Sequence, residues 1–441
     1  MASRIVRASL LAVLSSGLAA VATAHDPIDL GTLPGYTASR AKDVNEEGNI
    51  VGQAVRPGAE PIEQAVLWDH RRGGRYVLEP LPPLPGLVRG DARGFANGRA
   101  PIGFSYLVGP GFSLFRAVVW REDPTGERVS LELTPPPGFT DATALAANAR
   151  GQIAGAALNP LEVINGSTVQ HAALWRLLRG DPNRPDDPPE YEVCDLGVPD
   201  GFDASSASGI NEQGDVVGTA RRFESDGSGG LLLRSTVVVW RKPWRHHRPC
   251  VSDPIVLPSR PELPLNQNPA INEGGDVVAQ ADRRVTGQPV VSRPLLWRRC
   301  DGDHVEPVEL PVPEGFTDAF ATDVNASGRV LGTALVRSST GALQASRAVV
   351  WRLCHRGGAA VSLLANPAGT TLTVGAHLND RGDAVGSAPL PLPGSSGGLL
   401  WRGATSRRGH DGDDDDDGDD DGDDDDRDDH RGDSCRPDED R

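Results

Sequence analysis

Lysine and aromatic residues are scarce in this chain of 441 residues. Lys42 and Lys242 are the two lysines among its 44 lysine and arginine residues, a bias that indicates a GC-rich genome. Aromatic residues make up 5% of the chain, so a core must be built mainly from Val, Leu and Ala. The net charge is −17 and the body carries no basic stripe, which argues against a nucleic-acid interface.

A long apolar run occurs once, at the N-terminus. Arg4 and Arg7 precede the apolar stretch of residues 8–21, and an Ala-x-Ala site follows at residues 22–24. This order predicts a secretory signal peptide over residues 1–24. The run is too short for an ordinary membrane span, and no later run is long enough. We therefore expect an extracellular or periplasmic protein without a membrane span.

The clearest pattern is a unit of about 50 residues that recurs about seven times along the chain. Its first copy opens at Leu30, continues with an Asn-x-x-Gly-x-x-x-Gly segment from Asn45 to Gly52, and ends in an apolar run at Trp68. Asn can bond its own backbone and Gly accepts a positive φ, so Asn-x-x-Gly predicts a tight turn between two strands. Residues 65–68 and 76–78 predict a third and a fourth strand.

The same signals return along the chain. The turn returns at Asn148, Asn211, Asn272, Asn325 and Asn379, with a degraded copy at residues 96–99, and the tryptophan returns at Trp120, Trp175, Trp240, Trp297, Trp351 and Trp401. Because these tryptophans hold the same place in every unit, we expect them to pack between neighbouring sheets rather than to bind sugars.

Four short strands in each period predict an all-β fold, a seven-bladed β-propeller of four-stranded repeats. No fourth strand follows Trp401, whereas residues 28–30 form a strand without a repeat of its own. We expect this N-terminal strand to complete the last blade and to close the ring, which removes the exposed edges of an open array. An open β-solenoid is the alternative.

These residues resemble the HAF-repeat family of extracellular proteins. Residues 210–218, Ile-Asn-Glu-Gln-Gly-Asp-Val-Val-Gly, are similar to the turn of that family, and residues 171–175, His-Ala-Ala-Leu-Trp, are similar to its name-giving strand. The resemblance covers residues 29–402. It implies an extracellular propeller fold without an established chemistry, and it supplies no catalytic residues.

The five cysteines suit the oxidising compartment that a signal peptide implies. Cys300 and Cys354 occupy equivalent places in adjacent repeats, too far apart for a bridge. Cys250 can pair with either Cys300 or Cys194. The odd number leaves one thiol over, for which Cys435 is the candidate, and no Cys-x-x-Cys indicates a zinc or redox site.

The composition changes abruptly at His410, so we divide the chain into the signal peptide, a repeat body over residues 25–409 and a tail over residues 410–441. The tail holds 19 acidic and 4 basic residues, which predicts disorder. Its carboxylates are a candidate for weak, diffuse attraction of calcium, and no other cofactor is expected. The residues chosen to represent them are Asp413, Asp415, Asp417, Asp419, Asp421 and Asp423. A purely solubilising or secretion-assisting tail is the alternative.

Insertions into the repeats are where a function is most readily added, and three stand out, at residues 161–170, 179–190 and 241–249. The third carries the candidate ligand-binding residues Trp244, Arg245, His246, His247 and Arg248. Charge and stacking would let them hold an anionic glycan or a phosphate. A solvated loop, or docking of the acidic tail, are the alternatives.

Linear enzyme motifs are missing: the chain has no Gly-x-Ser-x-Gly, His-Glu-x-x-His or P-loop. Asp43 and Asp323 precede two of the Asn turns, but most copies lack the further ligands of a calcium loop, so we interpret them as plain turns. We expect a secreted, monomeric, non-enzymatic module that binds an extracellular protein or glycan. The alternative is a polysaccharide hydrolase or lyase with a site at the propeller axis, since a propeller can build a site from single residues of several blades.

Overall fold

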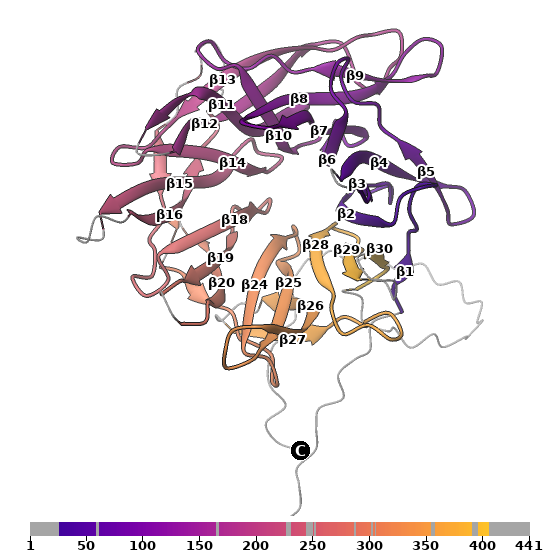
Figure 1. Cartoon of the computed structure of the whole chain (residues 1–441). Coiled ribbons are helices and arrows are strands. Elements are labelled where there is room, and N and C mark those ends of the chain that lie inside the picture. Colours follow the sequence, from indigo (N-terminus) through magenta and orange to yellow (C-terminus); the bar gives the residue numbers. More distant parts are fainter. Residues whose placement is uncertain are drawn as a thin grey trace, which may run out of the picture.

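The computed structural model of the chain is all-β (Figure 1). It describes residues 26–404 except 59–60, 165–166, 226–230, 244–249, 251–252, 286–287, 301–302, 305, 354–357 and 390–395. These residues form strands β1 to β30 and no helix. Accordingly, the described part offers no helix that could cross a membrane. The predicted signal peptide and acidic tail lie outside it.

The strands form three four-stranded sheets, two eight-stranded sheets that each join two repeats, and one two-stranded hairpin. The repeats follow one another around a common centre (Figure 1). The first repeat contains β2 (Ala38–Val44), β3 (Ile50–Arg56), β4 (Ile62–Arg71) and β5 (Arg75–Pro80). The second contains β6 (Arg89–Ala96), β7 (Ala100–Gly109), β8 (Phe112–Glu122) and β9 (Arg128–Glu132). The third contains β10 (Asp141–Ala147), β11 (Gln152–Ile164), β12 (Ser167–Arg179) and β13 (Glu190–Gly197). In each repeat, the first strand lies nearest the common centre (Figure 1).

The remaining repeats keep this order with additions. The fourth contains β14 (Ala204–Ile210), β15 (Val216–Ser225), β16 (Leu231–Trp240) and β17 (Pro254–Val256). The fifth contains β18 (Leu265–Ile271), β19 (Val277–Arg283), β20 (Val291–Trp297) and β23 (Val308–Glu309), with an added hairpin of β21 (Arg299–Cys300) and β22 (Asp303–His304). The sixth contains β24 (Asp318–Val324), β25 (Arg329–Arg337), β26 (Leu343–Leu353) and β27 (Ala359–Leu363).

The last repeat draws its strands from both ends of the described chain. It contains β28 (Val374–Leu378), β29 (Ala384–Pro389) and β30 (Ser396–Trp401), and β1 (Ile28–Asp29) pairs antiparallel with β30. The backbone amide of Leu30 continues this ladder by donating to the carbonyl of Gly398 at 3.0 Å. Single parallel bridges also join β30 to β2 and β16 to β18.

The seven repeated tryptophans form the centre of the packing between sheets, as the sequence predicted. Each is 0–1% exposed, and each contacts aliphatic residues of the preceding repeat, as Trp175 does with Ile102 and Val119. Six of the indole N–H groups donate to a carbonyl 36–41 residues earlier, as Trp297 does to Pro258 at 2.7 Å. Trp240 is the exception, because its buried N–H has no partner among the described residues.

The predicted Asn turns are confirmed. In the first copy, the side-chain oxygen of Asn45 accepts the backbone amides of Glu47 (3.1 Å) and Asn49 (2.7 Å), and Gly48 has φ +86°. The Asn side chains also connect the repeats. The side-chain amide of Asn45 donates to the carbonyl of Gly98 at 2.8 Å, and the side-chain amide of each later Asn donates to the Asn carbonyl of the next repeat. These bonds run from Asn148 to Asn211, to Asn272, to Asn325, to Asn379 and from Asn379 to Asn45, at 3.0–3.2 Å.

The second repeat departs from this pattern, and the insertion at residues 179–190 compensates for it. Asn97 has φ +49°, and its backbone amide, rather than its side chain, donates to Asn148. Asn183 of the insertion donates to the carbonyl of Asn97 at 3.1 Å, and Arg121 donates to the carbonyl of Pro185 at 2.5 Å. The insertion therefore packs on the degraded repeat.

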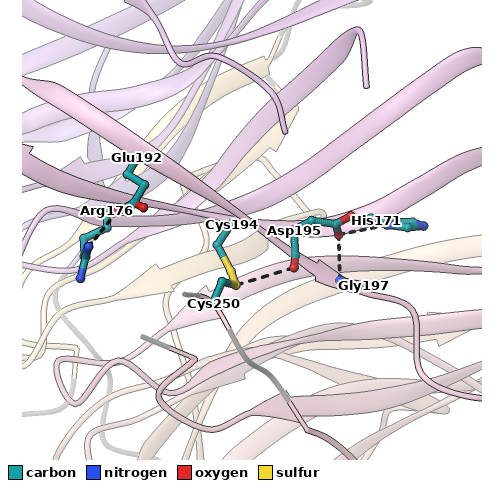
Figure 2. The surroundings of a disulfide bond; sticks show 7 residues. All are labelled: His171, Arg176, Glu192, Cys194, Asp195, Gly197 and Cys250. Carbon is teal, nitrogen blue, oxygen red and sulfur yellow. Dashed lines mark hydrogen bonds and ion pairs between the residues drawn. A yellow bond between two sulfur atoms is a disulfide. The ribbon is translucent and has the colours of Figure 1, made fainter. Parts of the chain in front are cut away.

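A disulfide joins the third and fourth repeats (Figure 2). Cys194 in β13 is bonded to Cys250, and their Cα atoms lie 5.7 Å apart. The structure thus selects one of the two partners that the sequence left open for Cys250. The bridge fixes the chain directly after residues 244–249, which hold the candidate binding loop.

Candidate functional site at the axis

Every innermost strand carries a β-bulge at the same level, where the pairing with its neighbour shifts register. The second Gly of each turn motif explains it. A Cβ on Gly52 would lie 2.0 Å from the carbonyl oxygen of Arg40, so only Gly admits this approach. The fifth repeat has Ala279 instead of this Gly, and there two residues, Asn268 and Pro269, bulge opposite the unpaired Ala279.

The bulges point one extra residue of each repeat at the centre of the molecule. They line a central cavity of about 420 Å³ to which all seven innermost strands contribute. The bulge residues are Lys42, Arg93, Leu145, Ser208, Asn268, Pro269, Thr322 and Ala376. A second cavity of about 500 Å³ adjoins it on the side of the Asn turns, and Asp43, Asp323 and His377 line both. Cavities of this size accommodate small ligands.

The central cavity has two chemically different walls. Strands β2, β6, β24 and β28 supply Lys42, Asp43, Arg93, Asp323 and His377, the charged side chains. Strands β10, β14 and β18 supply the opposite wall from uncharged and mostly apolar residues, with Ser208 and Asn268 as its polar side chains. Those residues are Leu145, Ala146, Ala147, Ser208, Gly209, Ile210, Asn268, Pro269, Ala270 and Ile271. A ligand with one polar edge and one apolar face fits this arrangement.

His377 lies between two carboxylates at the charged wall. Its Nδ1 is 2.7 Å from Asp43 Oδ1, and its Nε2 is 3.4 Å from Asp323 Oδ2. Burial lowers the pKa of His377, but the charges of Asp323 and Asp43 outweigh burial and raise the pKa to about 10. The ring is therefore an imidazolium at neutral pH, and it connects the first, sixth and last repeats.

Lys42 and Arg93 share a third carboxylate beside this cluster. Lys42 Nζ lies 2.5 and 2.6 Å from the two oxygens of Asp91, and Arg93 Nη2 lies 2.8 Å from Asp91 Oδ2. Burial lowers the pKa of Lys42 to about 8, because the opposing charge of Asp91 recovers only part of the lost hydration and Arg93 and Arg40 add to the lowering. Lys42 therefore loses its proton more readily than an ordinary lysine.

Carboxylates surround the opening on the side of the Asn turns, but they bond to backbone amides there. Glu212 accepts from Ala149 at 2.6 Å, Asp380 from Ala326 at 2.7 Å, and Glu46 from Asp380 at 2.8 Å. No group of three or more His, Cys, Asp or Glu within the described residues has an arrangement that could hold a metal ion. These acids therefore hold the turns together.

The sequence-predicted site residues lie outside the described part of the chain. These are Trp244, Arg245, His246, His247 and Arg248 in the insertion, and the tail residues Asp413, Asp415, Asp417, Asp419, Asp421 and Asp423. They stay predictions. The sequence analysis missed the axial cluster, although it considered Asp43 and Asp323 as calcium ligands. The second Gly of each turn was the signal that could have found it, since it requires a bulge in the facing strand.

The chain shows similarity to known proteins at the level of structure alone. No family model matches the chain, and no curated protein matches it in sequence. The resemblance to the HAF-repeat family stays a prediction.

Among solved structures, a protein of unknown function from Dyadobacter fermentans is 11% identical, with a TM-score of 0.42, covering 86% of this chain and 98% of that one. A polysaccharide lyase described as an ulvan lyase is 10% identical, with a TM-score of 0.38, covering 79% and 96%. Trypanosoma rangeli sialidase is 8% identical, with a TM-score of 0.39, covering 76% and 57%. Likenesses this weak do not bear on what the chain does.

Proposed function

We propose that the seven repeats are the blades of a propeller closed by β1. The pairing of Ile28 with Leu400 and the bond from Asn379 to Asn45 support this closure. Leu30→Ala and Leu364→Ala provide a matched test, because both leucines open a repeat and both are buried. In a closed ring, each substitution should cost about 2–5 kcal/mol of unfolding free energy. In an open array, Leu30→Ala would cost little because the terminal strand already frays.

We propose that the protein is an extracellular enzyme, a hydrolase or lyase, that acts on a polysaccharide at the axial cavity. One observation carries the proposal: ionisable side chains from four repeats meet at the cavity opposite an apolar wall. Groups whose pKa values are shifted and that face a cleft are typical of functional sites. Sugars combine hydroxyl edges with apolar C–H faces, and the two walls of the cavity offer partners for both.

A panel of plant, algal and bacterial glycans tests this function. The products to look for are new reducing ends and the ultraviolet absorbance of unsaturated sugars. We expect turnover of at least one glycan, and we expect Arg93→Gln to reduce it. The control is Arg184→Gln, since Arg184 lies in the insertion at residues 179–190 and does not line the cavity. Absence of turnover across the panel would overturn the enzymatic proposal.

A non-enzymatic binding module is the second candidate. Both carboxylates at the cavity are engaged by His377, which favours recognition over acid–base chemistry by Asp43 and Asp323. The acidic tail would then provide cation-dependent attachment. Pull-downs from the cell envelope with the mature chain, with and without residues 410–441, in calcium and in chelator, separate the two parts. A partner retained without the tail would place binding on the repeats.

A further inference from the structure

The choice of lysine at position 42 is unusual for this chain. Elsewhere it uses arginine almost without exception, and Lys242 is the one other lysine. The neighbouring bulge carries Arg93, so the cavity accepts an arginine at the equivalent place in the next repeat. Arginine and lysine differ chiefly in that arginine cannot release its proton in a protein, whereas a buried lysine can. The exception therefore points to a need for the neutral amine.

We propose that Lys42 is the general base of a β-elimination that cleaves a uronate-containing polysaccharide in the central cavity. This inference rests on the proposed function and names its reaction and substrate class. The hydrolytic alternative needs two free carboxylic groups on either side of the glycosidic bond. Asp43 and Asp323 do not meet that need, because His377 lies between them and pairs with both.

The reaction balances with the residues at the site. Neutral Lys42 removes the proton at C5 of the uronate, and the electron pair of that C–H bond forms the double bond between C4 and C5. The bond between C4 and the glycosidic oxygen breaks, and the ammonium of Lys42 returns the proton to the leaving oxygen. The products are one unsaturated sugar end and one new reducing end, and no oxidant or metal enters the balance.

The charged wall supplies what such a reaction requires besides the base. The uronate carboxylate gains negative charge as C5 loses its proton, and Arg93 and the His377 imidazolium lie on the same wall to stabilise it. Asp91 accepts hydrogen bonds from Lys42 and forms an ion pair with Arg93, so it orients the base and its neighbour together. The pKa of Lys42, lowered to about 8 by burial, leaves a useful fraction of neutral amine at slightly alkaline pH.

Substitution at position 42 tests the base. We expect Lys42→Arg and Lys42→Gln each to lower kcat/KM on an acidic glycan by about 10²- to 10⁴-fold. The matched control is Lys242→Arg, which should leave kcat/KM unchanged. Lys242 is exposed and does not line the cavity. Since Lys42→Arg keeps the positive charge, activity that survives it would overturn the proposal.

The pH profile separates a base from a structural lysine. Activity should rise with pH through about 8, where Lys42 loses its proton. Asp91→Asn removes the charge that raises the pKa of Lys42, so the rising limb should move to lower pH. If the Lys42–Asp91 pair is purely structural, Asp91→Asn would lower stability without moving the rising limb of the pH–activity profile. A limb that does not move would refute the assignment of Lys42 as the base.

The chain's two lysines make binding measurable without turnover. After reductive ¹³C-methylation, NMR should show one signal for each lysine beside that of the N-terminal amine, and Lys242→Arg assigns the lysine signals. An oligo-uronate should shift the Lys42 signal and leave Lys242 unmoved, while a neutral oligosaccharide of the same length should shift neither. New reducing ends without unsaturated products would refute elimination yet keep the proposed function. Turnover of no glycan would reject that function, and an unmoved Lys42 signal would reject the uronate site.

Discussion

The unpaired indole of Trp240 makes a sharp prediction about two chemically identical substitutions. Trp240→Phe and Trp297→Phe each shrink a side chain that is 0% exposed and packed between two sheets. The loss of ring volume is common to both. Trp297→Phe also removes the N–H that donates to the Pro258 carbonyl at 2.7 Å, which costs about 1 kcal/mol.

In Trp240→Phe, the loss of the N–H group stabilises the folded state instead. The buried N–H of Trp240 has no partner in the described structure, so its desolvation already costs the native state about 1–3 kcal/mol. Phenylalanine removes that N–H and recovers the cost. Trp240→Phe should therefore be less destabilising than Trp297→Phe by about 2 kcal/mol or more.

Urea unfolding followed by circular dichroism gives the comparison, because the difference between the two variants cancels the shared loss of volume. A third variant, Trp351→Phe, should resemble Trp297→Phe, since Trp351 donates to Pro311 at 2.8 Å. Equal destabilisation of all three variants would show that the indole hydrogen bonds contribute nothing to the energetics of these interfaces, and the reasoning would fail.

Two further predictions concern the axial histidine and the disulfide. The pKa of His377 is raised in the folded state, so its contribution to stability is complete below about pH 6.5 and is lost as pH rises towards about 10. Between pH 6.5 and 8, below the range in which Lys42 acts in the opposite sense, urea midpoints of the native chain should fall, and those of His377→Gln should fall less. Reduction of the bridge between Cys194 and Cys250, 56 residues apart, should cost about 2–4 kcal/mol, and reductant should have no such effect on Cys194→Ser.

The repeat architecture could be predicted because packing imposes it in every unit. Trp68 and its six equivalents occupy the same buried place, and the turn that begins at Asn45 needs the same Asn and Gly in each copy. A packing requirement that recurs in every repeat produces a periodic pattern of residues in the sequence. The degraded second copy shows the limit of such a trace, since residues 179–190, from another repeat, supply the missing contacts at Asn97.

The residues of the axial site show no such periodic pattern, because packing between sheets does not constrain them. The bulge places one residue of each repeat at the centre, where it contacts a cavity rather than a neighbouring sheet. Packing does not select that residue, so the bulge positions range from the charged Lys42 to Leu145 and Thr322. What does repeat, in six of the seven units, is the Gly that faces the bulge, whose missing Cβ gives room to the carbonyl of the bulged strand. In repeat proteins of this kind, the variable bulge positions next to such a recurrent glycine contact are therefore where a function should be sought first.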